Sequence, residues 1–97
     1  ADRKKNGEYI ANIILNLARN TRVPGLTFNV VQPGAILTDR NGAVLADADF
    51  RRGVEAKIPL GRIGEASDCA GIVAFLASPE AAYINGAVLS VDGGMRL

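Results

Sequence analysis

The sequence predicts an α/β fold, arranged as one half of a doubly wound parallel sheet. Two segments carry apolar residues at helical spacing, and two short apolar runs each end at a glycine-containing turn. A long stretch separates these two runs, as the crossover between parallel strands requires. The expected order is therefore helix, strand, loop with a short helix, helix, strand.

The first predicted helix covers residues 8–19. Its large apolar residues recur at helical spacing, and alanines beside them widen the apolar stripe. We therefore expect this helix to be buried over much of its circumference. Residues 20–25 should end it, because Pro24 disfavours a helical residue before it and Gly25 tolerates unusual backbone angles.

The first predicted strand covers residues 26–31, a run rich in β-branched and aromatic residues that stops before Pro33 and Gly34. The periodicity weakens after this strand, and polar residues dominate residues 38–53. We interpret that stretch as a mobile loop with a short helical piece, which runs on into residues 54–57.

The second predicted helix covers residues 66–77, with acidic and serine side chains near its positive end. Asn85 and Gly86 then indicate a turn, and residues 87–91 form the second predicted strand. That strand ends at a turn of three residues, Asp92, Gly93 and Gly94.

Composition excludes several kinds of site and partner. Eleven Lys and Arg against ten Asp and Glu leave a net charge of +1, which argues against nucleic acid and anionic membranes. The basic cluster at residues 3–5 is too short to change this. The chain has no histidine and one cysteine, Cys69, which excludes an intramolecular disulfide, a Cys/His metal site and a His-based triad. The single cysteine fits a reducing setting, so we expect a cytoplasmic protein. The apolar stretches are much shorter than the roughly 20 residues that cross a bilayer.

Several motifs follow one another along the chain: Asn-Leu-Ala-Arg at residues 16–19, Phe-Asn-Val-Val-Gln-Pro-Gly at 28–34, Ile-Pro-Leu-Gly-Arg-Ile-Gly at 58–64, Phe-Leu-Ala-Ser at 75–78 and Val-Asp-Gly-Gly at 91–94. Together, at this spacing, they resemble the second half of the short-chain dehydrogenase/reductase family. The resemblance covers almost the whole chain. It implies that residues 1–97 form a single partial domain, the C-terminal portion of a Rossmann-like fold.

The resemblance also implies a nicotinamide cofactor, NAD or NADP. In the family, the segment that resembles residues 33–38 lies against the nicotinamide end of the cofactor. Pro33 and Gly34 would let the backbone turn close to the ring, the Ile36 backbone would meet the carboxamide, and the Thr38 hydroxyl would bond the carboxamide or a phosphate. The alternative is that Pro33 and Gly34 merely end a strand.

Three further features take an expected role from the same resemblance. Residues 38–57 correspond to the family's variable substrate lid, which would select an alcohol or carbonyl substrate, although an ordinary solvated loop is the alternative. Residues 92–94 are expected to form a turn near a subunit contact. Arg62 is expected to be a structural ion-pair or helix-capping residue rather than a substrate ligand.

The family's acid/base machinery is the part that this sequence does not match. Family members use the Tyr of a Tyr-x-x-x-Lys motif for proton transfer, but neither Tyr9 nor Tyr83 has a lysine four positions later. A gapless register places Arg3 and Gly7 at the two positions. Registers with inserted residues leave two alternatives, Lys5 with Ala1, or Lys4 with a tyrosine just before the chain begins.

Two functions therefore stay open. The chain is either the C-terminal part of an NAD(P)-dependent oxidoreductase or a non-catalytic interaction module that keeps the family's folding pattern. The first would transfer a hydride between nicotinamide and an alcohol or carbonyl, and would be inactive alone because the glycine-rich cofactor motif and the catalytic Ser and Tyr are missing. In the resembling enzymes the helix at residues 8–19 packs against its counterpart in a neighbouring subunit, so a homo-oligomer is expected.

Overall fold

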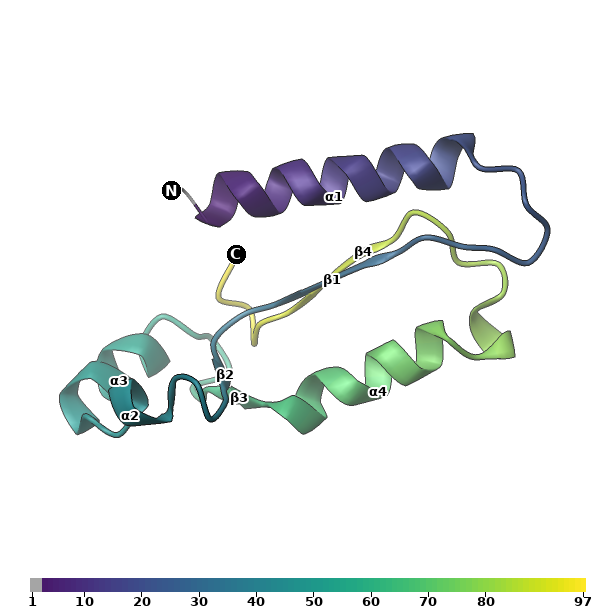
Figure 1. Cartoon of the computed structure of the whole chain (residues 1–97). Helices are drawn as coiled ribbons and strands as arrows, with labels where there is room; N and C mark the ends of the chain where they lie inside the picture. The colour runs from purple at the N-terminus through teal and green to yellow at the C-terminus, as the bar shows by residue number, and fades with distance from the viewer. Residues whose placement is uncertain (1–2) are drawn as a thin grey trace. The chain divides into compact units, whose positions relative to one another are not determined.

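The computed structural model describes residues 3–97, with side chains from Lys5 onward. Ala1, to which one register assigns the tyrosine role, lies outside the described residues, as do the side chains of Arg3 and Lys4. In chain order the elements are α1 (Arg3–Asn20), β1 (Val30–Pro33), β2 (Ile36–Leu37), α2 (Gly42–Leu45), α3 (Ala48–Glu55), β3 (Gly64–Glu65), α4 (Ala66–Leu76), the 3-10 helix η1 (Pro79–Ala81) and β4 (Val88–Val91). Figure 1 labels all of them except η1.

The structure confirms both long helices and the second strand, although α1 begins earlier than predicted, at Arg3 instead of residue 8. The first strand begins later than predicted, at Val30. The Phe28 amide donates to the Asn85 side chain (2.9 Å), and the Leu26 amide closes a turn onto the Val23 carbonyl (3.1 Å). Apolar, β-branched residues indicated a strand over residues 26–31. The Phe28 amide is instead hydrogen-bonded to a side chain, so the strand begins later along the chain.

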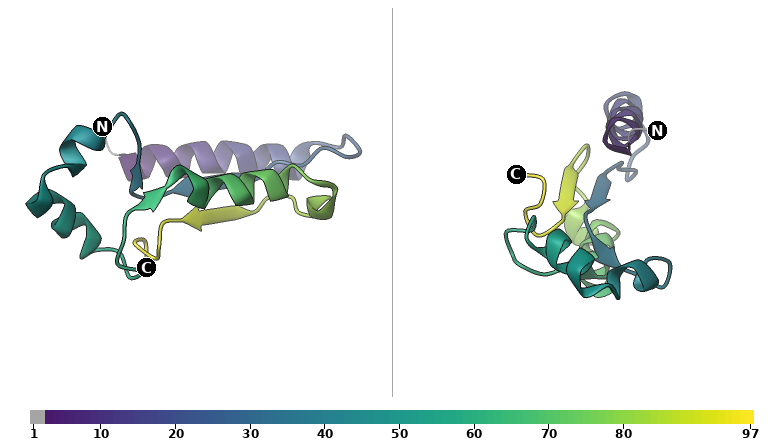
Figure 2. Two further views of the ribbon diagram at one scale, coloured as in Figure 1. Left: turned by 90° about the horizontal axis from the view of Figure 1, so that it is seen from below. Right: turned by 90° about the vertical axis from the view of Figure 1, so that its left-hand side faces the viewer.

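The interpretation of residues 38–57 as a loop with one short helical piece is wrong, because it underestimated the helical content. The segment holds two helices, α2 and α3, which pack against each other (Figure 2). Asp47 caps α3, because its carboxylate accepts hydrogen bonds from the amides of Asp49 (3.0 Å) and Phe50 (3.1 Å). The side-chain cap, rather than a long apolar period, starts this helix.

The strands form two separate pairs, β1 with β4 and β2 with β3. The second pair is parallel, with Ile36 opposite Gly64. Hydrogen bonds between β1 and β4 advance along both strands in the same direction, from Val30 with Ala87 (2.9 Å) to Gly34 with Val91 (3.0 Å). The predicted parallel arrangement with a long crossover is therefore confirmed, and the short pair β2–β3 was not predicted.

The chain divides into two compact units, one of Ala1–Val31 with Val73–Leu89 and the other of Gln32–Ile72 with Ser90–Leu97. In the first unit, two asparagines connect the segments before the paired strands. Asn85 donates to the carbonyl of Ala18 in α1 (3.0 Å), and Asn29 accepts from the Ala87 amide (2.8 Å). Side-chain amides thus supply the hydrogen bonds where the strands have not yet begun.

The second unit has the larger apolar core. Leu45, Ile58 and Ile63 are buried, and Ala35 and Val54 pack against them. Burial of these side chains places α2, α3 and the segment before β3 around one cluster. This cluster holds the loop that follows β1, since Ala35 belongs to that loop.

The predicted burial of the first helix over much of its circumference is wrong for this chain. From Lys5 to Asn20, where α1 has described side chains, only Ala11 and Ala18 are buried, whereas Tyr9 is 68% and Ile10 58% exposed. The helix forms where predicted, because periodicity sets the helix, but burial depends on what covers it. Residues 3–97 contain no helix long and apolar enough to cross a membrane.

Leu45 and Val44 provide a matched test of the core. Leu45→Ala should destabilise the chain by about 2–4 kcal/mol, because the side chain is 6% exposed and its removal leaves a cavity. Val44→Ala, at a position 54% exposed, should change stability by less than about 0.5 kcal/mol. Urea unfolding followed by circular dichroism measures both, and equal losses would contradict the assigned core.

Candidate nicotinamide loop and adjoining pocket

The loop after β1 is fixed by a close backbone contact at Gly34. Its amide donates to the Val91 carbonyl (3.0 Å), and a Cβ on Gly34 would lie 2.5 Å from the Cβ of Asp92. Such a distance is impossible for a side-chain atom, so this position requires glycine. Gly34 therefore has a packing role that sequence analysis did not anticipate. Its expected role beside a nicotinamide ring, like that of the exposed Pro33, stays a prediction.

Ile36 and Thr38 lie further along the same loop. Ile36 begins β2, whose partner strand is anchored by a hydrogen bond from the Gly64 amide to the Ala35 carbonyl (2.9 Å). The side chain of Asn41 accepts from the Thr38 amide (2.7 Å) and donates to the Ile36 carbonyl (2.7 Å). Thr38 is exposed, and its hydroxyl has no hydrogen-bond partner among residues 3–97.

Sequence analysis did not identify Asn41 as part of this loop. The available signal was an asparagine directly before Gly42, at a position where a helix begins. That signal predicts a cap on the following helix, whereas the Asn41 side chain bonds to the preceding loop. Only the tertiary structure shows this direction.

An open pocket of about 430 Å³ adjoins the loop within the second unit. Of the four candidate cofactor residues, Ile36 lines it and Pro33, Gly34 and Thr38 do not. The pocket begins where β4 ends and the loop after β1 turns, which is where open α/β sheets place ligands. Its walls are mostly apolar and comprise Ala35, Ile36, Pro59, Leu60, Arg62, Gly64, Asp68, Ser90, Val91, Asp92, Gly93, Gly94 and Leu97.

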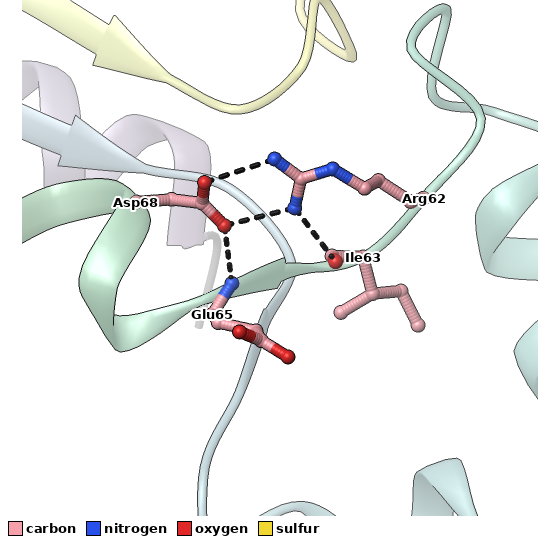
Figure 3. Close-up of polar contacts among 4 residues, drawn as sticks. All are labelled: Arg62, Ile63, Glu65 and Asp68. Carbon is pink, nitrogen blue, oxygen red and sulfur yellow. Dashed lines mark hydrogen bonds and ion pairs between the residues drawn. The ribbon is translucent and has the colours of Figure 1, made fainter.

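Arg62 makes the structural ion pair that the sequence led us to expect (Figure 3). Its guanidinium donates to both carboxylate oxygens of Asp68, at 2.9 Å each. Asp68 lies in the first turn of α4 and also accepts from the Glu65 amide (2.7 Å), so it closes the helix start. Hydrogen bonds from Arg62 and from the Glu65 amide hold the pKa of the Asp68 carboxyl well below its usual range.

The turn at residues 92–94 forms as predicted and packs against the segment before Arg62. The Asp92 side chain is 7% exposed, and its carboxylate accepts from the amides of Gly94 (3.0 Å) and Arg96 (3.1 Å). Gly93 has a positive φ of 64°, and a Cβ there would lie 2.7 Å from Ile58 Cγ2. Asp92 thus folds the end of the chain against one wall of the pocket.

Comparison with known proteins decides the family. The family model described as enoyl-(acyl carrier protein) reductase matches residues 9–96. The chain belongs to the short-chain dehydrogenase/reductase family. This is a family of NAD(P)-dependent oxidoreductases, and its members have the Rossmann-type α/β fold that the sequence predicted.

Curated relatives are similar over most of this chain. It is 54% identical over 82 residues to the 3-oxoacyl-(acyl-carrier-protein) reductase FabG of Escherichia coli, covering 84% of this chain and 33% of the relative. It is 54% identical over 71 residues to an L-rhamnose 1-dehydrogenase (NAD(P)(+)) of Sphingomonas, covering 73% of this chain and 28% of the relative. The chain therefore spans about a third of the length of these relatives.

Solved structures show the same relationship. A putative 2-deoxy-D-gluconate 3-dehydrogenase from Agrobacterium tumefaciens with bound NADP is 37% identical, with a TM-score of 0.83 over 92% of this chain and 36% of that one. A blue fluorescent protein from a metagenomic library, in complex with NADPH, is 41% identical, with a TM-score of 0.80 over 93% and 35%.

The described part of the chain offers few groups for proton transfer. Tyr9 is 68% exposed on α1 and Tyr83 is fully exposed after η1, and neither begins a Tyr-x-x-x-Lys motif. Among residues 3–97, no three His, Cys, Asp or Glu side chains lie together as metal ligands. The site therefore has groups that can orient a ligand by hydrogen bonding and shape, without an assigned acid/base.

Gly34 and Gly53 give opposite expectations for one substitution. Gly34→Ala should destabilise the chain by at least about 1 kcal/mol, because the new Cβ collides with Asp92. Gly53→Ala should stabilise it by about 0.5–1 kcal/mol, because Gly53 lies within α3 with open space around it. Thermal unfolding of both variants measures this, and a stabilised Gly34→Ala chain would refute the contact.

The Arg62–Asp68 pair should make the free energy of unfolding depend on pH in the acidic range. Since the folded pKa of Asp68 lies below the ordinary value of about 4, Asp68 stabilises the folded chain above that pH. This contribution is lost as the pH falls below about 4, towards the folded value. The stability gap between the native chain and Asp68→Asn should therefore shrink between pH 6 and pH 3, as measured by urea unfolding. The exposed Asp39→Asn replacement controls for loss of one charge, and a gap independent of pH would contradict the assignment.

Proposed function

We propose that this chain is the C-terminal part of an NAD(P)-dependent dehydrogenase/reductase, forming a single partial domain in a cytoplasmic enzyme. The whole enzyme would transfer a hydride between nicotinamide and the carbon of a small alcohol or carbonyl substrate. The observation that carries the proposal is the Gly34–Thr38 loop, held outside the carboxyl end of β1 beside an open pocket. Similarity to proteins named for NAD(P) or solved with NADP or NADPH supports it.

In this proposal the loop orients the nicotinamide end of the cofactor. Bound there, NAD or NADP supplies the hydride chemistry. Pro33 and Gly34 shape the turn, the Ile36 backbone meets the carboxamide, and the Thr38 hydroxyl donates to the carboxamide or a phosphate. The exposure of the Thr38 hydroxyl supports its role, because it is available to a ligand.

Residues 38–57 would be the substrate lid. Their two helices carry exposed apolar side chains, with Val44 54% and Phe50 51% exposed. Apolar groups on a closing lid can exclude water from a carbonyl or alcohol carbon during hydride transfer. The lid would therefore contribute substrate selection rather than acid/base chemistry.

The isolated chain should have no turnover. No tyrosine within it begins a Tyr-x-x-x-Lys motif, and no glycine-rich phosphate loop occurs in its sequence. Orientation of the cofactor without proton transfer leaves the chemical step unassisted. Cofactor binding, and not activity, is thus the property to test first.

The titration uses nicotinamide fluorescence, which the absence of Trp leaves free of tryptophan background. We expect weak, saturable binding of both NADH and NADPH with affinities within about twofold, because the residue that discriminates the adenosine ribose is not in this loop. Thr38→Val should weaken binding about tenfold through loss of one hydrogen bond. Thr21→Val, in the other compact unit, is the matched control. No binding at millimolar cofactor would overturn the proposed site.

A second candidate function is assembly through α1. Four large apolar side chains on that helix are 43–68% exposed, namely Tyr9, Ile10, Ile13 and Leu17. An exposed apolar face of this kind is typical of a protein contact, and a second copy of the chain would cover it in a homo-oligomer. This function is compatible with the first, since a homo-oligomeric enzyme would use both.

Substitutions at Ile13 and Asn12 test whether the exposed apolar face of α1 is an assembly contact. Ile13→Glu should shift the chain towards monomer, because a charge in an apolar contact is desolvated without a partner. Asn12→Glu adds the same charge at an exposed neighbouring position and should leave the mass unchanged. Sedimentation velocity over a hundredfold concentration range measures both, and a monomeric native chain would exclude this function.

A further inference from the structure

The side chain of Asn41 does not cap the helix that it precedes, as an asparagine at a helix start usually does. It occupies the N-cap position of α2, yet its side chain makes no hydrogen bond to that helix. An N-cap hydrogen bond ordinarily stabilises the helix that it starts. Here the half-buried side chain turns back towards the preceding loop instead.

Both polar atoms of the Asn41 amide are used in that loop. Its oxygen accepts from the Thr38 amide and its nitrogen donates to the Ile36 carbonyl, each at 2.7 Å. The Asn41 backbone amide adds a third contact, to the Thr38 carbonyl (3.2 Å). One residue therefore fixes the backbone on both sides of Leu37.

The direction of the backbone groups in β2 explains why the Asn41 hydrogen bond matters for Ile36. The Ala35 carbonyl accepts from Gly64 of β3, and successive carbonyls of a strand point to opposite edges. The Ile36 backbone groups therefore point away from β3, towards the edge that Asn41 occupies. Without Asn41, no other described contact holds the Ile36 carbonyl on that side.

We propose that Asn41 is a positioning residue for the cofactor loop. It presents the Ile36 backbone and the Thr38 hydroxyl in a fixed arrangement before a nicotinamide carboxamide arrives. This inference rests on the proposed function and extends it to a residue outside the 33–38 segment. It also explains the residue type, because the site needs a donor and an acceptor on one short planar group.

Aspartate distinguishes the positioning role from helix capping. Asp and Asn are about equally good N-cap residues, so Asn41→Asp should be silent if Asn41 only starts α2. In the positioning role the same variant places a carboxylate oxygen against the Ile36 carbonyl, and the donor is lost. Asn20→Asp is the matched control, since Asn20 also donates to a backbone carbonyl, that of Asn16 (2.9 Å), but in the other unit.

The experiment titrates the ¹⁵N-labelled full chain with NADH and follows amide shifts together with hydrogen exchange of the Thr38 amide. We expect Asn41→Asp and Asn41→Ala each to weaken NADH binding roughly tenfold, with Asn20→Asp unchanged. The Thr38 amide should lose protection from hydrogen exchange in Asn41→Ala, because its acceptor oxygen is removed. It should stay protected in Asn41→Asp, because the aspartate keeps a side-chain oxygen at that position.

Two results overturn the inference, and they are distinguishable. Native binding that persists unchanged in Asn41→Asp and Asn41→Ala would reduce Asn41 to a turn residue while leaving the proposed function intact. Failure of the native chain to bind NADH at millimolar concentration would remove the proposed function, and the positioning role with it, whatever the exchange of the Thr38 amide.

Discussion

The second unit depends on the close approach of Gly34 to Asp92. Because Gly34 has no side chain, the loop after β1 lies directly against the turn that follows β4, with the Gly34 amide bonded to Val91. Ala35 and Ile36 line the pocket together with the turn that Asp92 organises through its buried carboxylate. A side chain at position 34 would separate the two loops and remove the wall.

Asparagine side chains supply hydrogen bonds wherever the backbone pattern is interrupted. Asn29 and Asn85 join the segments that lead into β1 and β4, and Asn41 holds the segment that leaves β2. An amide carries one acceptor and a donor group, so a single residue can satisfy two neighbouring backbone groups of opposite polarity. Within the second unit, the irregular backbone of the candidate loop is ordered by the Asn41 side chain, which suits a ligand site that needs fixed geometry.

Two further features bear on the proposed function, namely the exposed apolar face of α1 and the share of its relatives that the chain spans. The α1 helix exposes large apolar side chains, and the matched residues make up about a third of the relative's length. Orientation of a cofactor and proton transfer are separable tasks, and this chain has groups suited to the first. The Arg62–Asp68 pair fixes the start of α4 beside the pocket.

Local patterns in the sequence determined the two long helices, the second strand, the parallel crossover and the family, because periodicity and motif spacing are properties of the chain itself. They also indicated that Arg62 is an ion-pair or helix-capping residue, though not its partner. Tertiary structure decided where β1 begins, how α2 and α3 pack, the reason for Gly34 and the direction of the Asn41 side chain. Each of these depends on contacts between residues distant in sequence or on which of two hydrogen-bonding choices is better satisfied, and a linear pattern does not contain that choice.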